Sequence, residues 1–398
     1  MSQLSQFIQN LPTKKNEAWK YTSLKSFAEN TWSMATADGM GLSHDELKKI
    51  SHLLKSEFYN FVFVNGFLNE TLSDDFEPWL QLSDESIQPD TFKSYSSEQT
   101  FLNLSAEKKS VLRMSVVANK HIDKPVQFVF VNKPMVATLS QMNLWIDLQP
   151  NASAQVLVHA MNAEESATQK APCAFNFSAR IQLADHASMK WAFVQNENEI
   201  DYHFSRIEFD LSEGSQLTSL DIALGGQTNR HYVSTTFNKK NAFAGVYGLT
   251  ALSEKQHTDH YTFIHHPMGE NQSMQHYKSI LTDEAHSVFR GRVRIEQDAQ
   301  KANSEQLNNN LLLTRTAQAE SIPQLEIYAD DVKAGHGSTM GQLSADEIFY
   351  FLSRGISQTE AIRILSFGYA KELVYKLENT ELQNAVFEIL NKKLGKMI

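Results

Sequence analysis

A long series of short, strand-like segments is the feature that most constrains this chain. From about residue 111 to residue 316, β-branched and aromatic residues alternate with polar ones, as in VQFVFVN at 126–132 and SVFRGRVRIE at 287–296. Strict alternation over a few residues is typical of a β-strand with one buried face. Helical patterns are nearly absent from this stretch. We therefore predict a mainly β protein with an all-β central unit.

A weak repeat runs through this unit. Turns of small residues recur near residues 152, 187, 214, 242 and 285, at intervals of 35, 27, 28 and 43 residues. Each interval has room for two or three short strands, which fits one coil of a β-solenoid. A β-sandwich also places short strands at such a spacing. The periodicity by itself leaves both folds open.

The first hundred or so residues mix helical and irregular patterns. The segment SHDELKKISHLLKSE at 43–57 carries apolar residues at helical spacing, with Ser43 and Glu46 placed as a capping box. Residues 74–100 are acidic and serine-rich, which indicates a surface connection. We predict an N-terminal mixed helical region over residues 1–105 and the β unit over residues 106–335.

The last part of the chain is predicted to be helical. Ser344, Ser357 and Thr380 each stand three positions before a Glu or a Gln, which is the spacing of a capping box. Apolar residues follow each of them at helical spacing. We expect three helices in a C-terminal helical domain over residues 336–398.

The composition excludes several classes of protein. Of the 398 residues, 41% are apolar and 21% are charged, which is typical of a folded chain. The formal net charge of -10 provides no global positive field, so we expect no nucleic-acid partner. No run approaches the ~18 apolar residues of a membrane span, and the N-terminus lacks the pattern of a secretory signal. We expect a cytoplasmic protein without a membrane span.

Familiar catalytic motifs are missing. The chain has no G-x-x-x-x-G-K-[ST] loop for nucleotide phosphates and no G-x-S-x-G nucleophile elbow. Cys173 is the only cysteine, so an intramolecular disulfide and a Cys-only metal site are excluded. It has no adjacent base, and we expect a small packed residue rather than a nucleophile. We therefore predict that the chain is not an enzyme.

A histidine-rich segment follows at residues 257–276. Neutral imidazoles together with a carboxylate suit zinc, iron or copper. Alternation in a strand, however, directs His265 and His266 to opposite faces, so both cannot bind one ion without distortion. A structural role is favoured over a metal site. The candidate side chains are His257, Asp259, His260, His265, His266 and His276.

Three consecutive asparagines, Asn308 to Asn310, end a polar run. Stacked asparagine side chains can form a hydrogen-bonded ladder between the coils of a solenoid. A polar recognition surface is the other interpretation, and we favour the ladder.

The segment QLEIYADDVKAGHGSTMG at 324–341 places Asp330, Asp331, Lys333 and His336 among three glycines. Such a group can hold a ligand or a partner. The plain alternative is a polar turn in which the glycines supply positive φ and the aspartates cap backbone donors. A β-helix carbohydrate-active enzyme with Asp330 and Asp331 as paired carboxylates is a further alternative. Adjacent aspartates of a strand point apart, which is poor geometry for glycoside hydrolysis.

Several segments together resemble the SufB/SufD family of iron–sulfur cluster assembly proteins, and within it the SufD branch. SufB chains are generally longer and contain several cysteines, whereas this chain contains one. The similar segments are LPTKKNEAWKYTSL, QHTDHYTFIHH, YKSILTDEAHSVFRGRVRIEQDAQKANSEQLNNNLLLT, QLEIYADDVKAGHGSTMGQL, FYFLSRGIS and ILSFGYAKEL.

The resemblance implies a fold and partners. It implies that the β unit is a right-handed parallel β-helix and that this unit pairs with SufB. It further implies that the C-terminal helices dock on SufC, an ABC-type ATPase, so that nucleotide chemistry belongs to the partner. The expected role is a non-enzymatic scaffold subunit of the SufBCD complex, with a possible homodimer when the chain is isolated. An iron–sulfur cluster would be held transiently and shared with SufB, and the isolated chain would hold none.

The resemblance also assigns a role to one histidine. The family turn that corresponds to Lys333 to Gly337 faces SufB, and its histidine is thought to help ligate the nascent cluster, a role that carries over to His336. Family members often have a cysteine where this chain has Ala334. Imidazole can replace thiolate as a cluster ligand, so His336 is the one metal-capable donor predicted in this turn. Asp330, Asp331 and Lys333 are the other predicted interface residues.

Overall fold

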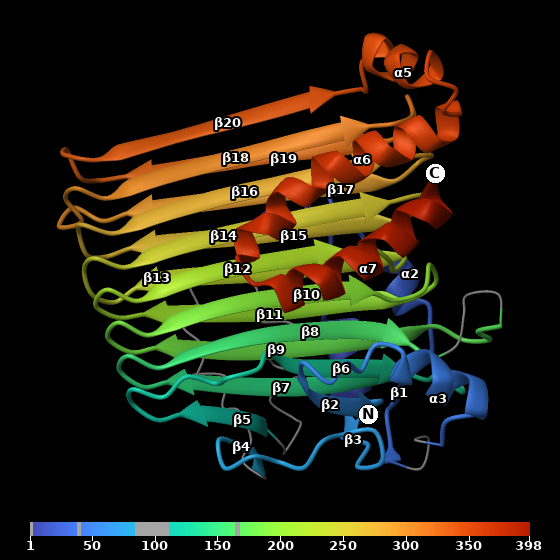
Figure 1. Cartoon of the computed structure of the whole chain (residues 1–398), viewed down its shortest axis with the longest axis horizontal. Coiled ribbons are helices and arrows are strands. Elements are labelled where there is room, and N and C mark those ends of the chain that lie inside the picture. Colours follow the sequence, from blue (N-terminus) through green and yellow to red (C-terminus); the bar gives the residue numbers. More distant parts are fainter. Residues whose placement is uncertain (1–2, 38–40, 84–110, 164–167) are drawn as a thin grey trace.

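The computed structural model describes residues 3–37, 41–83, 111–163 and 168–398. Its centre is a parallel β-helix made of two ten-stranded sheets (Figure 1). Each coil of the chain adds one strand to sheet A and the next strand to sheet B. The prediction of a mainly β fold is confirmed, and the solenoid is the correct one of the two folds that periodicity left open.

The strands of sheet A are β1 (Ser33–Met34), β4 (Leu80–Ser83), β5 (Val111–Val116), β7 (Thr138–Leu148), β9 (Cys173–Leu183), β11 (Tyr202–Leu211), β13 (Thr228–Phe237), β15 (His257–His266), β17 (His286–Ile295) and β19 (Gln318–Ile327). Those of sheet B are β2 (Tyr59–Val64), β3 (Phe67–Leu68), β6 (Val126–Asn132), β8 (Ser153–Asn162), β10 (Ser188–Asn196), β12 (Gln216–Ala223), β14 (Phe243–Leu252), β16 (Gln272–Leu281), β18 (Asn303–Leu312) and β20 (Lys333–Gly341). The helices are α1 (Gln3–Gln9), α2 (Lys25–Ala28), α3 (His44–Ser51), α5 (Ala345–Leu352), α6 (Gln358–Val374) and α7 (Thr380–Met397), with short 3₁₀ turns at Glu17–Trp19 and Tyr375–Leu377.

The turns that lead from sheet A to sheet B explain the weak repeat. From the β5–β6 turn to the β17–β18 turn, one residue in each has positive φ, for example Asn151, His186 and Asn241. The turn positions 152, 187, 214 and 242 all belong to this kind of turn, whereas Ala285 lies between β16 and β17, on the return from sheet B to sheet A. The predicted interval of 43 residues therefore joins two different kinds of turn, which is why it breaks the pattern.

The interior of the solenoid is aromatic in its first coils. Phe61 and Phe128 have ring centroids 5.8 Å apart, and Phe130 lies 5.4 Å from Phe175 and 5.6 Å from Phe177. Burying one such side chain stabilises the fold by about 1.5–3 kcal/mol.

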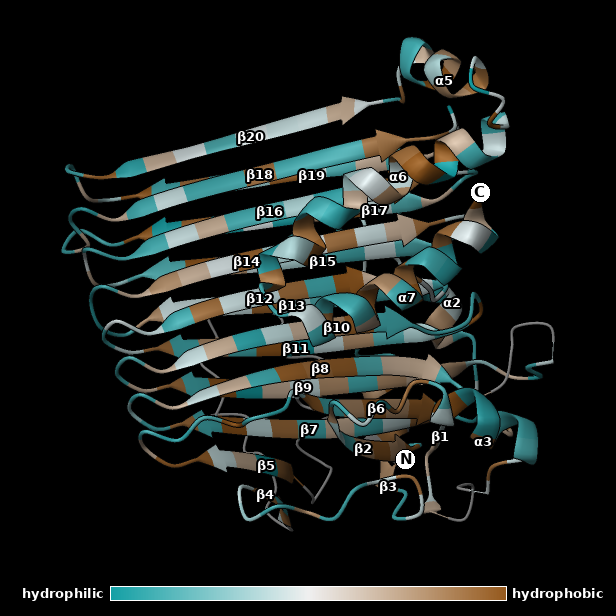
Figure 2. Ribbon diagram, in the orientation of Figure 1, coloured by the Kyte–Doolittle hydropathy of each residue, from teal (hydrophilic) through white to brown (hydrophobic). Residues whose placement is uncertain are grey.

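In the later coils, polar side chains occupy many of the inward positions. Figure 2 shows this change as strands β16 to β20 that are more hydrophilic than β6 and β8. Polar groups in an interior are tolerated where they bond to one another. Buried polar residues of β16 and β18 include Ser273, Gln275, Ser304, Gln306 and Asn308.

Helices α6 and α7 cover the outer face of sheet B (Figure 1). Leu373 and Leu390 of these helices join one apolar cluster with Leu220 and Leu249 of the sheet. Lys278 of β16 adds a hydrogen bond to the backbone oxygen of Tyr369 in α6, at 3.1 Å.

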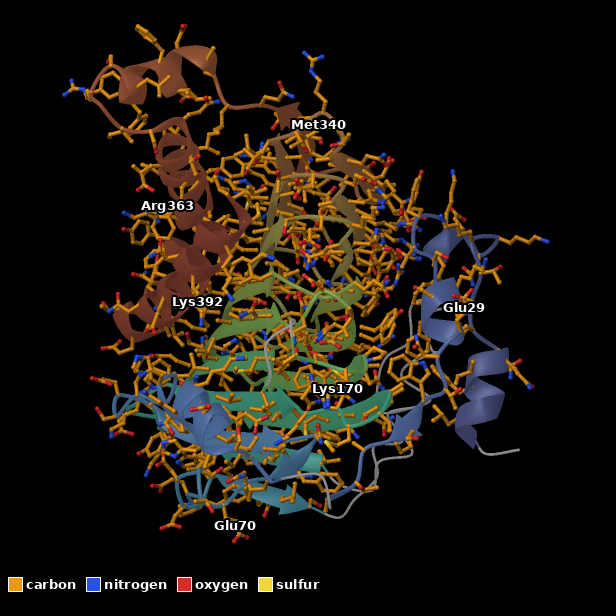
Figure 3. The ribbon with its side chains drawn as sticks, turned by 90° about the vertical axis from the view of Figure 1, so that its right-hand side faces the viewer. Glu29, Glu70, Lys170, Met340, Arg363 and Lys392 are labelled. Atoms are coloured by element: carbon orange, nitrogen blue, oxygen red, sulfur yellow. The ribbon has the colours of Figure 1, made fainter. Side chains whose placement is uncertain are left out.

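The N-terminal segment lies against sheet A, on the opposite flank from α6 and α7 (Figure 3). Trp19, Phe27 and Trp32 pack with Tyr202 and Phe204 of β11. Helix α3 instead packs on sheet B through Ile50. It is shorter than the helix predicted over 43–57.

Most of the predicted helix caps are confirmed. Ser43 and Ser344 form complete capping boxes, and Ser357 accepts a hydrogen bond at the start of α6. The cap predicted at Thr380 is wrong by one residue, because Asn379 caps α7. Asparagine is at least as good a cap as threonine.

Of the two predicted domain boundaries, only the second lies within the described residues. The predicted boundary after residue 105, and most of the acidic connection at 74–100, lie outside the described residues. Strand β20 continues to Gly341, past the boundary predicted after residue 335. Within the described ranges, no helix is long and apolar enough to span a membrane.

Candidate functional site

The last coil of the solenoid carries the residues predicted to be functional. Strand β19 pairs only with β17, and β20 pairs only with β18, within the part of the chain that the structure describes. Both strands therefore have one open edge. Figure 3 labels Met340 of β20 at this end of the molecule.

The four predicted residues are all exposed, but they do not share one turn. Asp330 and Asp331 lie between β19 and β20, whereas Lys333 and His336 belong to β20 itself. The prediction of a turn at Lys333 to Gly337 is wrong, because pairing with β18 extends the backbone through these glycine-rich residues. The glycines at 335, 337 and 341 are also not among the residues with positive φ.

Hydrogen bonds from main-chain groups hold the turn before β20 to the preceding coil. The amide of Asp331 donates to Gln300 Oε1 at 2.9 Å, and its carbonyl oxygen accepts from the amide of Lys301 at 2.6 Å. The amide of Lys333 donates to the carbonyl oxygen of Ala302 at 3.0 Å. These bonds use main-chain groups of Asp331 and leave its exposed carboxylate available to a partner.

His336 lies on the face of β20 that continues the interior of the solenoid. It is in register with Gln306 of β18, which is fully buried and donates to Gln275 Oε1 at 2.5 Å. Side chains in register on neighbouring strands share a face of the sheet. His336 is nevertheless exposed, because no later coil covers it.

Apolar side chains surround this open end. Ile327, Tyr328 and Met340 are 40%, 55% and 55% exposed. Glu326 of β19 accepts two hydrogen bonds from Arg292 of β17, at 2.8 and 2.9 Å, and this pairing raises the pKa of the Arg292 guanidinium. Strand β19 is thus held to β17 by side-chain hydrogen bonds as well as by its backbone, and apolar groups are exposed at this end.

The histidine-rich segment divides between the two faces of β15, as predicted for His265 and His266. His265 lies 3.1 Å from Glu296 on the outside, and His266 lies 2.9 Å from Ser273 on the inside. His276 belongs to a different strand, β16, and contacts Asn309 at 2.7 Å. The six predicted candidates therefore do not gather at one point.

A buried group of metal-capable side chains was missed by sequence reasoning. It consists of Asp221, His231 and His260, of which only His260 was a candidate. The Cα register pairs His231 with His260 directly. A signal existed, because the two histidines are separated by one coil of the repeat, but it could be used only once the coil length was known.

The predicted asparagine ladder is only partly present. Asn309 donates to Thr339 Oγ1 of β20 at 2.8 Å and contacts His276 of β16, so it does link three coils. Its neighbours on those strands are not asparagines. Asn310 donates to Asn308 of its own strand at 2.8 Å and to the backbone oxygen of Thr339 in β20 at 3.3 Å.

Cys173 is a packed residue, as predicted. It is 2% exposed, and burial raises the pKa of its thiol well above the ordinary value. A thiol held neutral in this way is a poor nucleophile and a poor metal ligand.

A pocket of about 770 Å³ lies beside α3 and α7, away from β20. Burial lowers the pKa of Lys393 in its wall to about 8. Lys392, in the same wall, is labelled on the helical flank in Figure 3. The polar lining includes Lys49, His159, Glu197, Lys392, Lys393 and Lys396.

Comparisons with known proteins agree with this architecture. Residues 130–369 match the family model described as "SUF system FeS cluster assembly, SufBD core domain". The chain is 29% identical to the iron–sulfur cluster assembly protein SufD of Escherichia coli, over 96% of this chain and 89% of that one. It is 26% identical to an iron–sulfur cluster assembly SufBD family protein of Synechocystis, over 94% and 85% of the two chains. SufD of Bacillus subtilis is 26% identical over 70% of this chain and 63% of that one.

Proposed function

The chain belongs to the SufBD family of iron–sulfur cluster assembly proteins, and from this premise we propose that it is a non-enzymatic scaffold subunit. Its open strand β20 pairs with SufB, and its C-terminal helices dock SufC. The iron–sulfur cluster is cargo of the assembled complex rather than a resident group of this chain.

The difference between the two ends of the solenoid carries the proposal. At the N-terminal end each sheet finishes in a short antiparallel strand, β3 against β2 and β4 against β5. Antiparallel additions of this kind terminate a parallel stack. At the C-terminal end β19 and β20 are parallel to their neighbours, and the described residues supply no cap. An open edge of this kind is a template for another chain.

The two open edges are not equivalent. The amides of Gln318 and Tyr328 donate toward the β17 side of the strand. Backbone amides of successive residues point to alternate sides, so the even-numbered positions face β17 and Pro323 faces the open side of β19. Proline there removes a donor and blunts the edge. By the same alternation from Lys333, the amides of Ala334, His336, Ser338 and Met340 face the open side of β20. Strand β20 contains no proline, so it is the edge that can accept a further strand.

His336 supports a role in holding the cluster. It is the only histidine in β20, the strand has no cysteine, and its side chain makes no hydrogen bond or ion pair with the described residues. Imidazole is an accepted ligand of iron–sulfur clusters. With Ala334 beside it, the remaining ligands must come from the partner. Asp330, Asp331 and Lys333 then supply polar contacts at the rim.

Helix α5 supports the docking of SufC. No residue of α5 is buried, and Phe349, Tyr350 and Leu352 are 68%, 54% and 43% exposed. Helices α6 and α7 already use their apolar faces against sheet B. Exposed aromatic residues that no element covers are typical of protein interfaces.

Co-purification tests the proposal. The untagged chain is co-expressed with tagged SufB and with SufC of the same organism, and the purified complex is analysed by mass. We expect a stable complex that contains all three chains and an isolated chain that does not hydrolyse ATP. A chain that fails to associate with either partner would refute the scaffold role.

A further inference from the structure

Three metal-capable side chains meet inside the solenoid, on strands distant from β20. Asp221 projects from β12, and His231 and His260 project from β13 and β15 of the opposite sheet. All three are buried, and each offers one ligand atom within 4.8 Å of the others. Of the described residues, these are the only three that meet this condition.

The two separations from Asp221 are close to the spacing of ligands around one ion. Asp221 Oδ2 lies 3.2 Å from His231 Nδ1 and 3.6 Å from His260 Nδ1. Metal–ligand bonds of about 2.1 Å place neighbouring ligand atoms roughly 3.0–3.4 Å apart. The ligand atoms of the three side chains all lie within 4.8 Å of one another, so binding one ion requires side-chain rotations that draw the two imidazoles closer together.

The carboxylate of Asp221 is buried against the two imidazoles. Neither oxygen of Asp221 has a hydrogen bond of acceptable geometry to the described residues, although Asp221 is 1% exposed. A buried carboxylate that accepts no hydrogen bond of good geometry is costly, and a bound cation would compensate it.

One of the two imidazoles, that of His260, is already oriented. His260 Nε2 lies 3.1 Å from Thr250 Oγ1, which leaves Nδ1, without a hydrogen-bond partner, facing Asp221. Contacts at the second nitrogen orient metal-binding histidines in this way. His231 Nδ1 also lies 3.1 Å from Ser205 Oγ, and metal binding would replace this contact.

A row of polar side chains connects this group to the pocket beside α7. Glu197 lines the pocket and lies 2.8 Å from His203 Nδ1. The ring of His203 stacks on that of His231 at 4.9 Å, and His231 stacks on His260 at 4.8 Å. The row provides a polar route from the pocket to the interior.

We propose that Asp221, His231 and His260 bind one divalent transition-metal ion inside the solenoid. Two imidazoles and one carboxylate suit Zn²⁺ and Fe²⁺, whereas Mg²⁺ and Ca²⁺ prefer oxygen ligands alone. Water completes the coordination. The site is separate from His336 and does not depend on the pairing with SufB.

Metal analysis tests the proposal directly. Untagged protein is unfolded in chelator, refolded with Zn²⁺ in slight excess, freed of loose metal and analysed for zinc. We expect about one tightly bound Zn²⁺ per chain and a higher melting temperature than that of protein refolded in chelator. His260→Gln and Asp221→Asn should each lower zinc retention at least tenfold.

His266→Gln is the matched control, because His266 is another buried, inward-facing histidine of β15 outside the group. It should retain zinc as the unaltered protein does. Equal retention in His260→Gln and the control, or no zinc in the unaltered protein, would overturn the proposal.

A second measurement needs no variant and so does not depend on the folding of one. Crystals of the zinc-refolded protein should give an anomalous peak at the zinc edge between Asp221, His231 and His260. A peak elsewhere, or none, would overturn the site.

Discussion

The hydroxyl of Thr22 donates a hydrogen bond of 2.6 Å to Asp259 Oδ2, across 237 positions of the sequence. The same carboxylate pairs with Arg230, whose guanidinium lies 4.2 Å from the ring centroid of Trp19. Arg290 donates to the backbone oxygen of Glu17 at 3.0 Å. The N-terminal segment is thereby fixed to the outer face of sheet A.

Thr22→Val should loosen this segment. Thr22 is 1% exposed, so valine fills its space but removes a hydrogen bond to a buried carboxylate. Such bonds contribute about 1.5–3 kcal/mol. We expect the free energy of local opening, measured by hydrogen exchange over residues 17–28, to fall by about that amount. Thr22→Ser keeps the hydroxyl and should stay close to the unaltered protein. Unchanged exchange in the valine variant would argue against the contact.

Substitutions of the two partners of the ion pair between α6 and sheet B should affect stability differently. Lys278 is 5% exposed and lies 2.5 Å from Glu372, whose side chain is 56% exposed. Glu372→Ala leaves a buried ammonium with fewer partners, and we expect a loss of about 1 kcal/mol in the free energy of unfolding. Adding Lys278→Met should recover most of this loss, because no buried charge then remains.

Denaturant unfolding of Glu372→Ala, of Lys278→Met and of the double variant checks this prediction. If the losses of the two single variants simply add, the two side chains are not coupled.

His266 should make the protein sensitive to acid. Burial, with a smaller contribution from the charge of His265, lowers the pKa of His266 from 6.5 to about 3. The unfolded chain therefore takes up a proton below pH 6.5 that the folded chain refuses until about pH 3, so stability falls as the pH falls through this window. His266→Gln removes this dependence, and Gln can keep the contact to Ser273.

Unfolding of the two proteins at pH 7 and at pH 4 gives the comparison. The unaltered protein should lose up to about 3 kcal/mol more than His266→Gln over this interval, at 1.36 kcal/mol per pKa unit. Equal losses would show that His266 is accessible to protons in the folded state.

His336→Ala should impair cluster assembly without impairing complex formation. The side chain is exposed, so its removal costs little stability, whereas the loss of a ligand lowers cluster occupancy. We expect at least a several-fold decrease in iron and sulfide bound by the reconstituted complex. The control is His121→Ala, an exposed histidine between β5 and β6 in the first coils. Equal occupancy in both variants would remove the ligand role of His336.

Local patterns predicted the strands well, because alternation in VQFVFVN or SVFRGRVRIE depends only on which face of each strand is buried. The same patterns could not predict contacts set by the coil register. Thr22 and Asp259 both lay in recognised motifs, yet nothing in either motif says that they touch. His231 and His260 share a position in successive coils, which is visible only when the pairing is known.

The structure places the predicted site residues near one another, but not in the predicted conformation. Asp330, Asp331, Lys333 and His336 all lie at the open end, but the glycines around His336 suggested a turn. Pairing of β20 with β18 outweighs the weak strand propensity of glycine. The polar end of the interior also escaped prediction, because inward and outward polar residues look alike in an alternating pattern.

Pairing of SufB with the open edge of β20 can be tested by the substitution Ser338→Pro. The amide of Ser338 faces the open side, so proline there removes a donor for an added strand and leaves the pairing with β18 intact, as Pro323 already does on β19. Ser338→Ala keeps the amide and serves as the control. Affinity for SufB is measured with each folded variant, together with its melting temperature. We expect at least tenfold weaker binding for Ser338→Pro and unchanged binding for Ser338→Ala, at similar melting temperatures. Equal affinity of the two variants for SufB would show that the open edge of β20 does not pair with SufB.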